Sequence, residues 1–315
     1  MERLFLITVL SAGLALQPAL VKAQDMSAPQ VPTFRSGVDL VTVSATVRDG
    51  KGRLVKDLDR RDFEVIDRGE RRTISAFRAE RAPVSLAILF DVSGSMDVAA
   101  RATAAKFAAY HLLSWLEDGR DEAALFAFDS RLHEVAPFTV DTRALQGALG
   151  EVDPFGATSL HDAIAEAAAR VATRPSQRRA VVVLTDGIDT SSRLTPAQVS
   201  ATAAAIDVPV YVIAIVLPID DPGSELATPQ THLAAPTSVG TIEDLARWTG
   251  GSLYYSSTSA SSSKAAHAVV DELRHVYLIA FEPGAVAGWH PLEIRTRQKD
   301  MVVRVRGGYM AGGVR

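Results

Sequence analysis

Four strand-length runs of apolar residues, separated by segments with the composition of helices, constrain this chain more than any other feature. Each run has little polar alternation, which is typical of a strand that is covered on both faces. The four runs are Ser85–Phe90, Glu122–Phe128, Arg179–Leu184 and Val208–Ile215. Alternation of such strands with helices predicts an α/β fold, namely a doubly wound, mostly parallel, Rossmann-like sheet with helices on both faces.

The residues before this α/β region have the pattern of a more exposed sheet. Val38–Val47 alternates apolar and polar side chains and is followed by the turn-forming sequence Asp-Gly-Lys-Gly. Residues 37–81 are therefore expected to form a small β module of the immunoglobulin-like or sandwich-like kind. The α/β domain is assigned to residues 82–256.

The remaining residues, 257–315, are predicted to contain a linker, a helix and C-terminal β strands. The serine-rich run Ser256–Ser263 is expected to be a flexible linker into a helix over Lys264–Arg274. Three strand-like segments follow that helix. They either extend the central sheet or join the N-terminal β module.

Residues 1–23 have the parts of a secretory signal peptide. Arg3 supplies a short basic region, Leu4–Leu16 is mostly apolar, and small residues lead up to Ala23. Cleavage after Ala23 leaves residues 24–36 as a flexible lead-in and predicts export to the periplasm or secretion. The alternative is an uncleaved anchor helix, although the apolar run is short for a bilayer span. No later stretch is long and apolar enough to give the mature chain a transmembrane segment.

The charge and cysteine content exclude several classes of protein. The net charge is −4, so no overall basic field favours nucleic acid as a partner. The pairs Arg60-Arg61 and Arg71-Arg72 are interpreted as solvated surface, because acidic residues surround them. The chain has no cysteine, which rules out disulfides, thiolate metal sites and a cysteine nucleophile.

Oxygen-bearing side chains gather in three loops that follow apolar runs or precede helices. Asp91, Ser93 and Ser95 follow the first run directly, Thr158 precedes a helix, and Asp186 follows the third run. Because ligand sites of such sheets lie at the carboxyl ends of the strands, these loops are expected to meet at one edge. Hard oxygen ligands favour Mg²⁺, with Mn²⁺ or Ca²⁺ as alternatives.

Asp-x-Ser-x-Ser, a later Gly-x-Thr loop and Thr-Asp-Gly after an apolar strand resemble the metal-ion-dependent adhesion site of von Willebrand factor A domains. The resemblance covers roughly residues 84–256 and fills every position of the motif. It implies that Ser93, Ser95 and Thr158 ligate the metal directly, and that Asp91 and Asp186 act directly or through water. It also implies an open coordination position for a carboxylate of a binding partner.

A second resemblance extends over the flanking segments. The chain is similar to a bacterial, largely acidobacterial, exported subfamily of these domains. The matching segments are Phe34–Ser36, Asp62–Val65, Ala82–Ser85, Tyr277–Phe281 and Gly307–Tyr309. This similarity bears on architecture more than on function.

The leading functional hypothesis is an exported adhesion-type protein, not an enzyme, that captures an acidic side chain of a protein partner through a bound cation. One alternative is a scaffold with a purely structural metal. A less favoured one is a Mg²⁺-dependent hydrolase or phosphotransferase. A phosphotransferase of the haloacid dehalogenase type needs an acid two residues after Asp91, where this chain has Ser93. A serine hydrolase needs Gly-x-Ser-x-Gly, which is incomplete here.

Simpler roles are assigned to the neighbouring polar residues. Asp91 and Ser93 have the alternative role of capping the next helix. Asp97 is expected to interact with a helix dipole, and Asp189 to bond its own turn. His161 is expected to have a surface or packing role.

Overall fold

The computed structural model of the chain describes residues 40–151, 157–205, 207–222 and 241–312. The predicted signal peptide and lead-in, residues 1–36, lie outside the described residues. None of the helices in the described ranges has the length and hydropathy needed to cross a bilayer.

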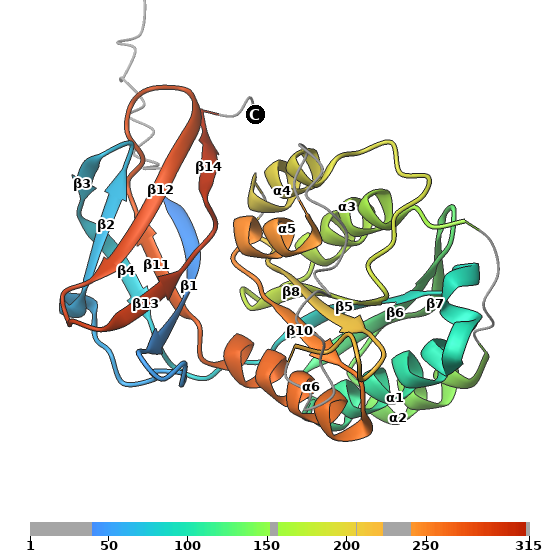
Figure 1. Ribbon diagram of the computed structural model, residues 1–315. Helices are drawn as coiled ribbons and strands as arrows, with labels where there is room; N and C mark the ends of the chain where they lie inside the picture. Colours follow the sequence, from blue (N-terminus) through green and yellow to red (C-terminus); the bar gives the residue numbers. More distant parts are fainter. Residues whose placement is uncertain (1–39, 152–156, 206, 223–240, 313–315) are drawn as a thin grey trace, which may run out of the picture. The chain divides into compact units, whose positions relative to one another are not determined.

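A six-stranded sheet forms the centre of the α/β region (Figure 1). Its order is β10-β9-β8-β5-β6-β7, and all neighbours are parallel apart from the antiparallel edge strand β7. The strands are β5 (Ser85–Asp91), β6 (Glu122–Phe128), β7 (Leu132–Thr139), β8 (Arg179–Thr185), β9 (Val210–Ile215) and β10 (Leu253–Ser256). The four apolar runs thus form the inner strands, and the predicted mostly parallel sheet is confirmed.

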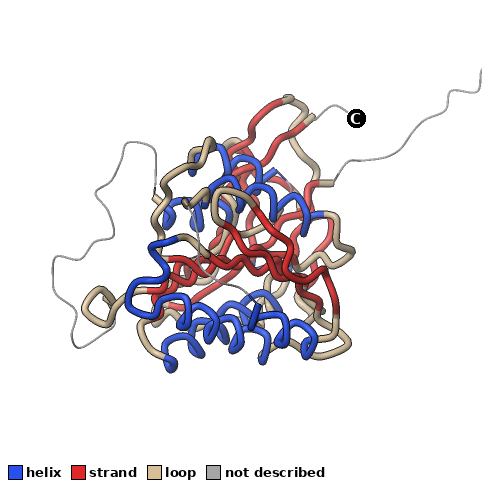
Figure 2. The backbone as a smooth tube through the Cα atoms, turned by 90° about the vertical axis from the view of Figure 1, so that its right-hand side faces the viewer, coloured by secondary structure: helices blue, strands red, loops and turns tan. Residues whose placement is uncertain are grey.

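Helices cover both faces of this sheet (Figure 2). They are α1 (Arg101–Ser114), α2 (Thr142–Ala148), α3 (Leu160–Ala172), α4 (Pro196–Ala205), α5 (Ile242–Thr249) and α6 (Ser259–Arg274), with 3-10 segments η1 (Arg60–Asp62), η2 (Gly94–Ala100) and η3 (Leu149–Glu151). Helices α1, α2 and α6 pack on one face, and α3, α4 and α5 on the other.

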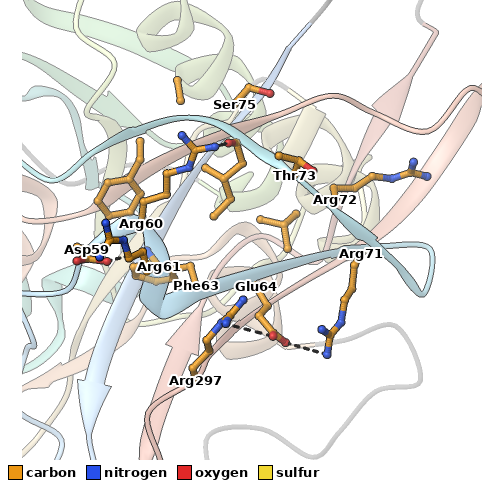
Figure 3. Close-up of a pocket in the computed structure, with 14 residues that line it drawn as sticks. Asp59, Arg60, Arg61, Phe63, Glu64, Arg71, Arg72, Thr73, Ser75 and Arg297 are labelled. Atoms are coloured by element: carbon orange, nitrogen blue, oxygen red, sulfur yellow. Dashed lines mark hydrogen bonds and ion pairs between the residues drawn. The ribbon is translucent and has the colours of Figure 1, made fainter.

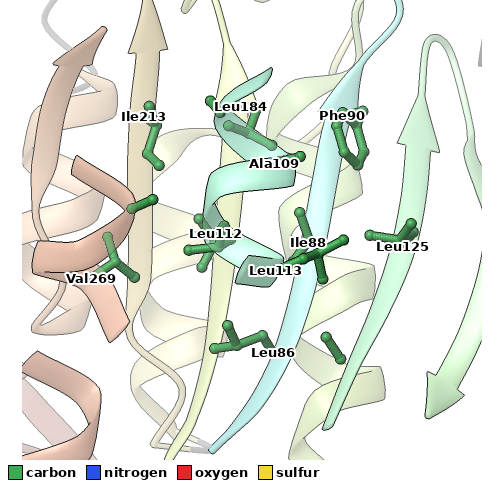
Figure 4. Packing of buried hydrophobic residues seen from close by; sticks show 14 of the residues in the cluster. Leu86, Ile88, Phe90, Ala109, Leu112, Leu113, Leu125, Leu184, Ile213 and Val269 are labelled. Carbon is green, nitrogen blue, oxygen red and sulfur yellow. The ribbon is translucent and has the colours of Figure 1, made fainter. Parts of the chain in front are cut away.

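Alternate residues of β5 point to opposite faces of the sheet and pack against the helices on each face. Ile88 and Phe90 lie on the face that α1 covers, as Figure 4 shows, whereas Ala87 and Leu89 pack towards α3. All four are buried. Truncating a large side chain in such a core costs about 2–5 kcal/mol. The apolar run is therefore continuous because both of its faces are covered.

Two four-stranded antiparallel sheets form a β sandwich. Their orders are β13-β1-β11-β4 and β14-β12-β2-β3. The strands are β1 (Val41–Asp49), β2 (Phe63–Asp67), β3 (Glu70–Arg72), β4 (Ile74–Arg78), β11 (Tyr277–Phe281), β12 (Gly288–Thr296), β13 (Met301–Arg304) and β14 (Gly308–Ala311). Both sheets combine N-terminal and C-terminal strands around a shared apolar core. Of the two alternatives for the C-terminal strands, the structure shows the one in which they join the N-terminal module.

The expected flexible linker over Ser256–Ser263 is wrong, because most of this run forms the first turns of α6. Thr258 caps the helix: its hydroxyl accepts the N–H of Ser261 at 3.1 Å, and the Ser261 hydroxyl accepts the Thr258 N–H at 2.9 Å. Ser262 is buried and its hydroxyl lies 2.6 Å from that of Ser256. Serine hydroxyls satisfy backbone groups at a helix start, so a serine-rich composition is no guide to flexibility here.

Candidate metal centre

Asp91 is the last residue of β5, which lies between β8 and β6. Its side chain is buried, and neighbouring groups hold both carboxylate oxygens. The N–H of Ser93 donates to Oδ1 at 2.9 Å, and the hydroxyl of Thr185 donates to Oδ2 at 2.5 Å. Because Thr185 ends β8, the second bond joins the carboxyl ends of two adjacent strands. Asp91 is thereby held at the edge of the sheet where such folds bind ligands.

The two serines of the Asp-x-Ser-x-Ser sequence follow in a tight turn. Ser93 is buried, and its hydroxyl oxygen lies 3.0 Å from that of Ser95. Gly94 begins η2, in which the buried Met96 donates its N–H to the Ser93 carbonyl at 3.0 Å. Met96 thus anchors the turn in the core, and the turn brings two hydroxyl oxygens together just beyond Asp91.

Asp186 follows the adjacent strand β8. Its Oδ1 accepts the N–H of Ile188 at 3.2 Å, and its Oδ2 accepts a hydrogen bond from Nη1 of Arg101 at 3.2 Å. Gly187 has a left-handed φ of 85°, which glycine adopts without steric cost. This conformation lets the Gly187 N–H donate to the Thr185 hydroxyl at 3.0 Å. The Thr185 hydroxyl therefore bonds both to the Asp91 carboxylate and to the turn that follows Asp186.

Thr158 lies in the loop before α3 and is buried. Its N–H donates to the Thr190 hydroxyl at 2.9 Å, and its carbonyl accepts the N–H groups of Thr190 at 3.0 Å and Ser191 at 2.9 Å. These bonds fasten the Thr158 loop to the loop that carries Asp186. Within the described residues, the hydrogen bonds of Thr158 run to this loop and not to the other four predicted ligands.

Burial raises the pKa of Asp91 above its usual range, since desolvation disfavours the carboxylate. The hydrogen bonds from Ser93 and Thr185 oppose this shift, and the nearby Asp186 carboxylate adds to it. Two neighbouring buried carboxylates need a compensating positive charge if both are to stay ionised. A positive charge beside these two carboxylates would therefore favour their ionised forms.

Arg101, the first residue of α1, brings one positive charge to this pair. Besides its bond to Asp186, its Nη1 lies 3.4 Å from the carbonyl oxygen of Ser95, and its buried Nε has no hydrogen-bond partner. A buried donor without a partner is unfavourable. Arg101 thus neutralises Asp186 at the expense of its own hydrogen bonding. This contact could not be predicted from the sequence, because an arginine inside a predicted helix carries no local signal of it.

The donor set fits a hard divalent cation. Where the structure describes the chain, no group of three or more His, Asp and Glu side chains is arranged to hold a metal ion. A cation here would depend on hydroxyl oxygens beside the two carboxylates, and oxygen-only ligation suits Mg²⁺ or Mn²⁺. The buried Asp91 carboxyl, whose pKa is raised, and the neighbouring Asp186 carboxylate supply the negative charge that a cation would balance.

Asp189 and His161 support the loops around this edge. The Asp189 carboxylate accepts the Ser192 hydroxyl at 2.7 Å, within its own turn as expected, and also the N–H of Leu160 at 2.9 Å at the start of α3. Nδ1 of His161 lies 3.2 Å from the same carboxylate. Burial lowers the pKa of His161, and Asp189 opposes that shift. Both side chains therefore hold α3 against the loop after β8.

Comparison with known families identifies the α/β region. Residues 86–188 match a family model described as von Willebrand factor type A domain. Together with the six-stranded, mostly parallel sheet, this match defines the class: the chain contains a von Willebrand factor type A domain. No curated protein matches the chain. The similarity to the acidobacterial subfamily stays a prediction.

Several solved structures are similar to parts of the chain. An aerotolerance-related membrane protein from Bacteroides fragilis is 20% identical over 60% of this chain and 98% of its own, with a TM-score of 0.45. A von Willebrand factor type A protein from Catenulispora acidiphila is 16% identical over 88% of this chain and 74% of its own, with a TM-score of 0.48. The vWF domain of the type V pili tip protein Mfa5 from Porphyromonas gingivalis is 24% identical over 37% of this chain and 42% of its own, with a TM-score of 0.32.

Proposed function

We propose that this protein is exported and uses its von Willebrand factor A domain to bind a divalent cation, through which it captures an acidic side chain of a protein partner. One observation carries the proposal. A buried aspartate with a raised pKa, Asp91, lies at the carboxyl end of the central strand, beside a second carboxylate and a pair of serine hydroxyls.

Five side chains would hold the cation. Ser93, Ser95 and Thr158 would supply neutral oxygens, and Asp91 and Asp186 would supply the charges, directly or through water. When bound, the cation supplies Lewis acidity and a coordination position for a ligand from outside. Two carboxylates balance its charge while neutral hydroxyls leave it electrophilic, which favours an added carboxylate. The protein's own contribution is to keep the hydroxyls of Ser93 and Ser95 side by side.

The same residues disfavour an enzymatic role. A catalytic aspartate at a strand end needs a second acid or base within hydrogen-bonding reach to move a proton. Both oxygens of Asp91 are bonded to Ser93 and Thr185, and position 93 has a hydroxyl in place of an acid. His161, which follows the Thr158 loop, pairs with Asp189. The arrangement is suited to holding a ligand, and the contacts of the described residues include no proton relay at Asp91.

Calorimetric titration with Mn²⁺ tests the cation site. We expect the wild type to bind one Mn²⁺ and Asp91→Asn to lose measurable binding, because the substitution removes a charge without changing the shape of the side chain. Asp129→Asn is the matched control, since Asp129 follows the neighbouring strand β6 but is not among the five residues. Retained binding in Asp91→Asn, or equal loss in the control, would overturn the site.

A capture experiment tests the role of the cation. Immobilised wild type and Asp91→Asn are incubated with envelope proteins in Mg²⁺ or in a chelator. We expect capture to require both Mg²⁺ and Asp91. If the protein binds Mn²⁺ but captures the same partners with and without the chelator, the result would instead support a scaffold with a structural metal.

A further inference from the structure

Two arginine pairs that are separate in the sequence come together on the β sandwich. Arg60, Arg61, Arg71, Arg72 and Arg297 line one groove of about 1150 Å³ (Figure 3). We call it the arginine groove. The local sequence predicts that both pairs are ordinary solvated surface. Strand pairing instead places them along the same groove, together with Arg297 from the C-terminal part of the chain.

The arginine groove lies along two edge strands, each of which has a strand neighbour on one side only among the described residues. β3 and β4 are edge strands of the two sheets, and the chain passes from one to the other at Thr73. β3 pairs only with Val65–Asp67 of β2, so the first part of β2 has β12 on one side and the groove on the other. Exposed strand edges offer backbone donors and acceptors to another extended chain.

The groove combines an apolar base with a positive rim. Phe63, Ile74 and Phe77 belong to or pack against the sandwich core and also line the groove. Five arginines face two acids, Asp59 and Glu64, which gives a formal charge of 5 − 2 = +3 in a chain whose net charge is −4. The groove is therefore a local reversal of the charge of the protein.

The two acids do not neutralise the rim. Glu64 is shared by Arg71, at 3.4 Å, and Arg297, at 3.6 Å, whose side chains are 77% and 64% exposed. Asp59 accepts the backbone N–H of Arg61 at 2.7 Å and caps η1. Ion pairs this exposed are weak, so the guanidinium groups of Arg71 and Arg297 remain available to a ligand. Arg72 instead pairs with Glu70 at 2.7 Å and with Asp67 at 3.3 Å, and Arg60 donates to the carbonyl of Ile74.

We propose that the arginine groove binds an extended peptide segment rich in aspartate and glutamate, which adds as a strand beside β4. The open edge supplies the peptide with backbone hydrogen bonds. The arginines pair with carboxylates on alternate side chains, because a strand presents every second residue to the same face. The apolar base accepts intervening aliphatic side chains. This site is distinct from the cation site of the α/β domain and does not depend on it.

Fluorescence anisotropy with a labelled octapeptide of alternating glutamate and valine tests the proposal on the full chain. We expect saturable binding in the presence of a chelator, which weakens as salt screens the charges. A triple variant with Arg61→Gln, Arg71→Gln and Arg297→Gln should bind about ten-fold more weakly. The matched control carries Arg53→Gln, Arg143→Gln and Arg247→Gln, which remove the same charge from exposed positions elsewhere. Equal affinity in the two triple variants would overturn the site.

Two further probes separate a strand-binding site from a general anion site. A backbone N-methylated version of the octapeptide keeps its carboxylates but loses strand hydrogen bonds, so we expect it to bind much more weakly. Inorganic polyphosphate has the charge without the strand geometry, and we expect it to compete poorly. If the methylated peptide and polyphosphate bind as well as the octapeptide, peptide recognition is wrong. If nothing binds, the arginines only protect the sheet edges from pairing.

Discussion

At the scale of single residues, Arg101 is the most informative side chain of the candidate site. It bonds to Asp186, and its own buried Nε has no hydrogen-bond partner among the described residues. A cation that binds between the carboxylates therefore competes with a positive charge that the chain itself supplies. Arg101 would then set how tightly the metal is held.

We expect Arg101→Gln to bind Mn²⁺ about ten-fold more tightly than the wild type, since the metal no longer displaces a guanidinium from Asp186. Without metal, the free energy of unfolding should fall by about 1 kcal/mol, because the ion pair is partly exposed. Calorimetric titration and urea unfolding measure the two effects. Arg101→Lys keeps the charge and serves as control. Equal or weaker Mn²⁺ binding in Arg101→Gln would refute the competition.

At the scale of elements, a buried pair joins strands β2 and β12 of the sandwich. Nδ1 of His290 lies 2.6 Å from Oδ1 of Asp67, and the N–H of Gly284 donates to Oδ2 at 2.9 Å. Burial by itself would raise the pKa of Asp67, but the hydrogen bonds from Gly284 and His290 outweigh it and hold the pKa below its usual range. The ionised Asp67 carboxylate therefore stabilises this strand pairing.

A carboxyl whose pKa is lower in the folded state stabilises the fold above its unfolded pKa, and this contribution is lost as the pH falls through the folded pKa. We expect Asp67→Asn to lower the free energy of unfolding by about 3 kcal/mol at pH 7. The difference from wild type should shrink below roughly pH 4. Urea unfolding across this pH range tests the prediction, with the exposed Glu293→Gln on β12 as control. A pH-independent difference would show that ionisation of Asp67 does not matter.

Some strands and helices can be recognised from their local sequence patterns, and others cannot. Each inner strand of the central sheet is recognisable from its own apolar run, because burial on both faces leaves a continuous pattern. The start of α6 is not recognisable in this way. Serine is common both in linkers and at helix starts, and only the bonds of Thr258 and Ser262 distinguish the two.

At the scale of the whole molecule, Glu272 of α6 connects the α/β domain to the sandwich. It is fully buried and accepts hydrogen bonds from Arg48 of β1 at 2.6 Å and from Tyr211 of β9 at 2.7 Å, and it also pairs with Arg304 of β13. Burial of the Arg304 guanidinium lowers the pKa of Arg304, because desolvation disfavours its charged form. Among the described residues, Glu272 is the one carboxylate that forms ion pairs with these two arginines.

We expect Glu272→Gln to lower the free energy of unfolding by about 3 kcal/mol, because it leaves two partly or largely buried guanidinium groups without a counter-charge. Glu166→Gln, on the exposed face of α3, removes an ion pair with Arg170 and should change stability by less than about 1 kcal/mol. Differential scanning calorimetry compares the two variants. Similar stability in both would mean that Glu272 does not hold the molecule together.

The amino-acid sequence by itself determined the α/β class, the inner strands of the sheet and the five oxygen-bearing residues proposed for the cation site. These features are local: a strand is encoded in its own run, and parallel strands bring their following loops to one edge. Tertiary structure alone decided that N- and C-terminal strands share the sandwich, that Arg101 reaches Asp186, and that Arg61 and Arg297 line one groove. Each of these depends on segments brought together by long-range pairing and packing, for which a short stretch of sequence carries no signal.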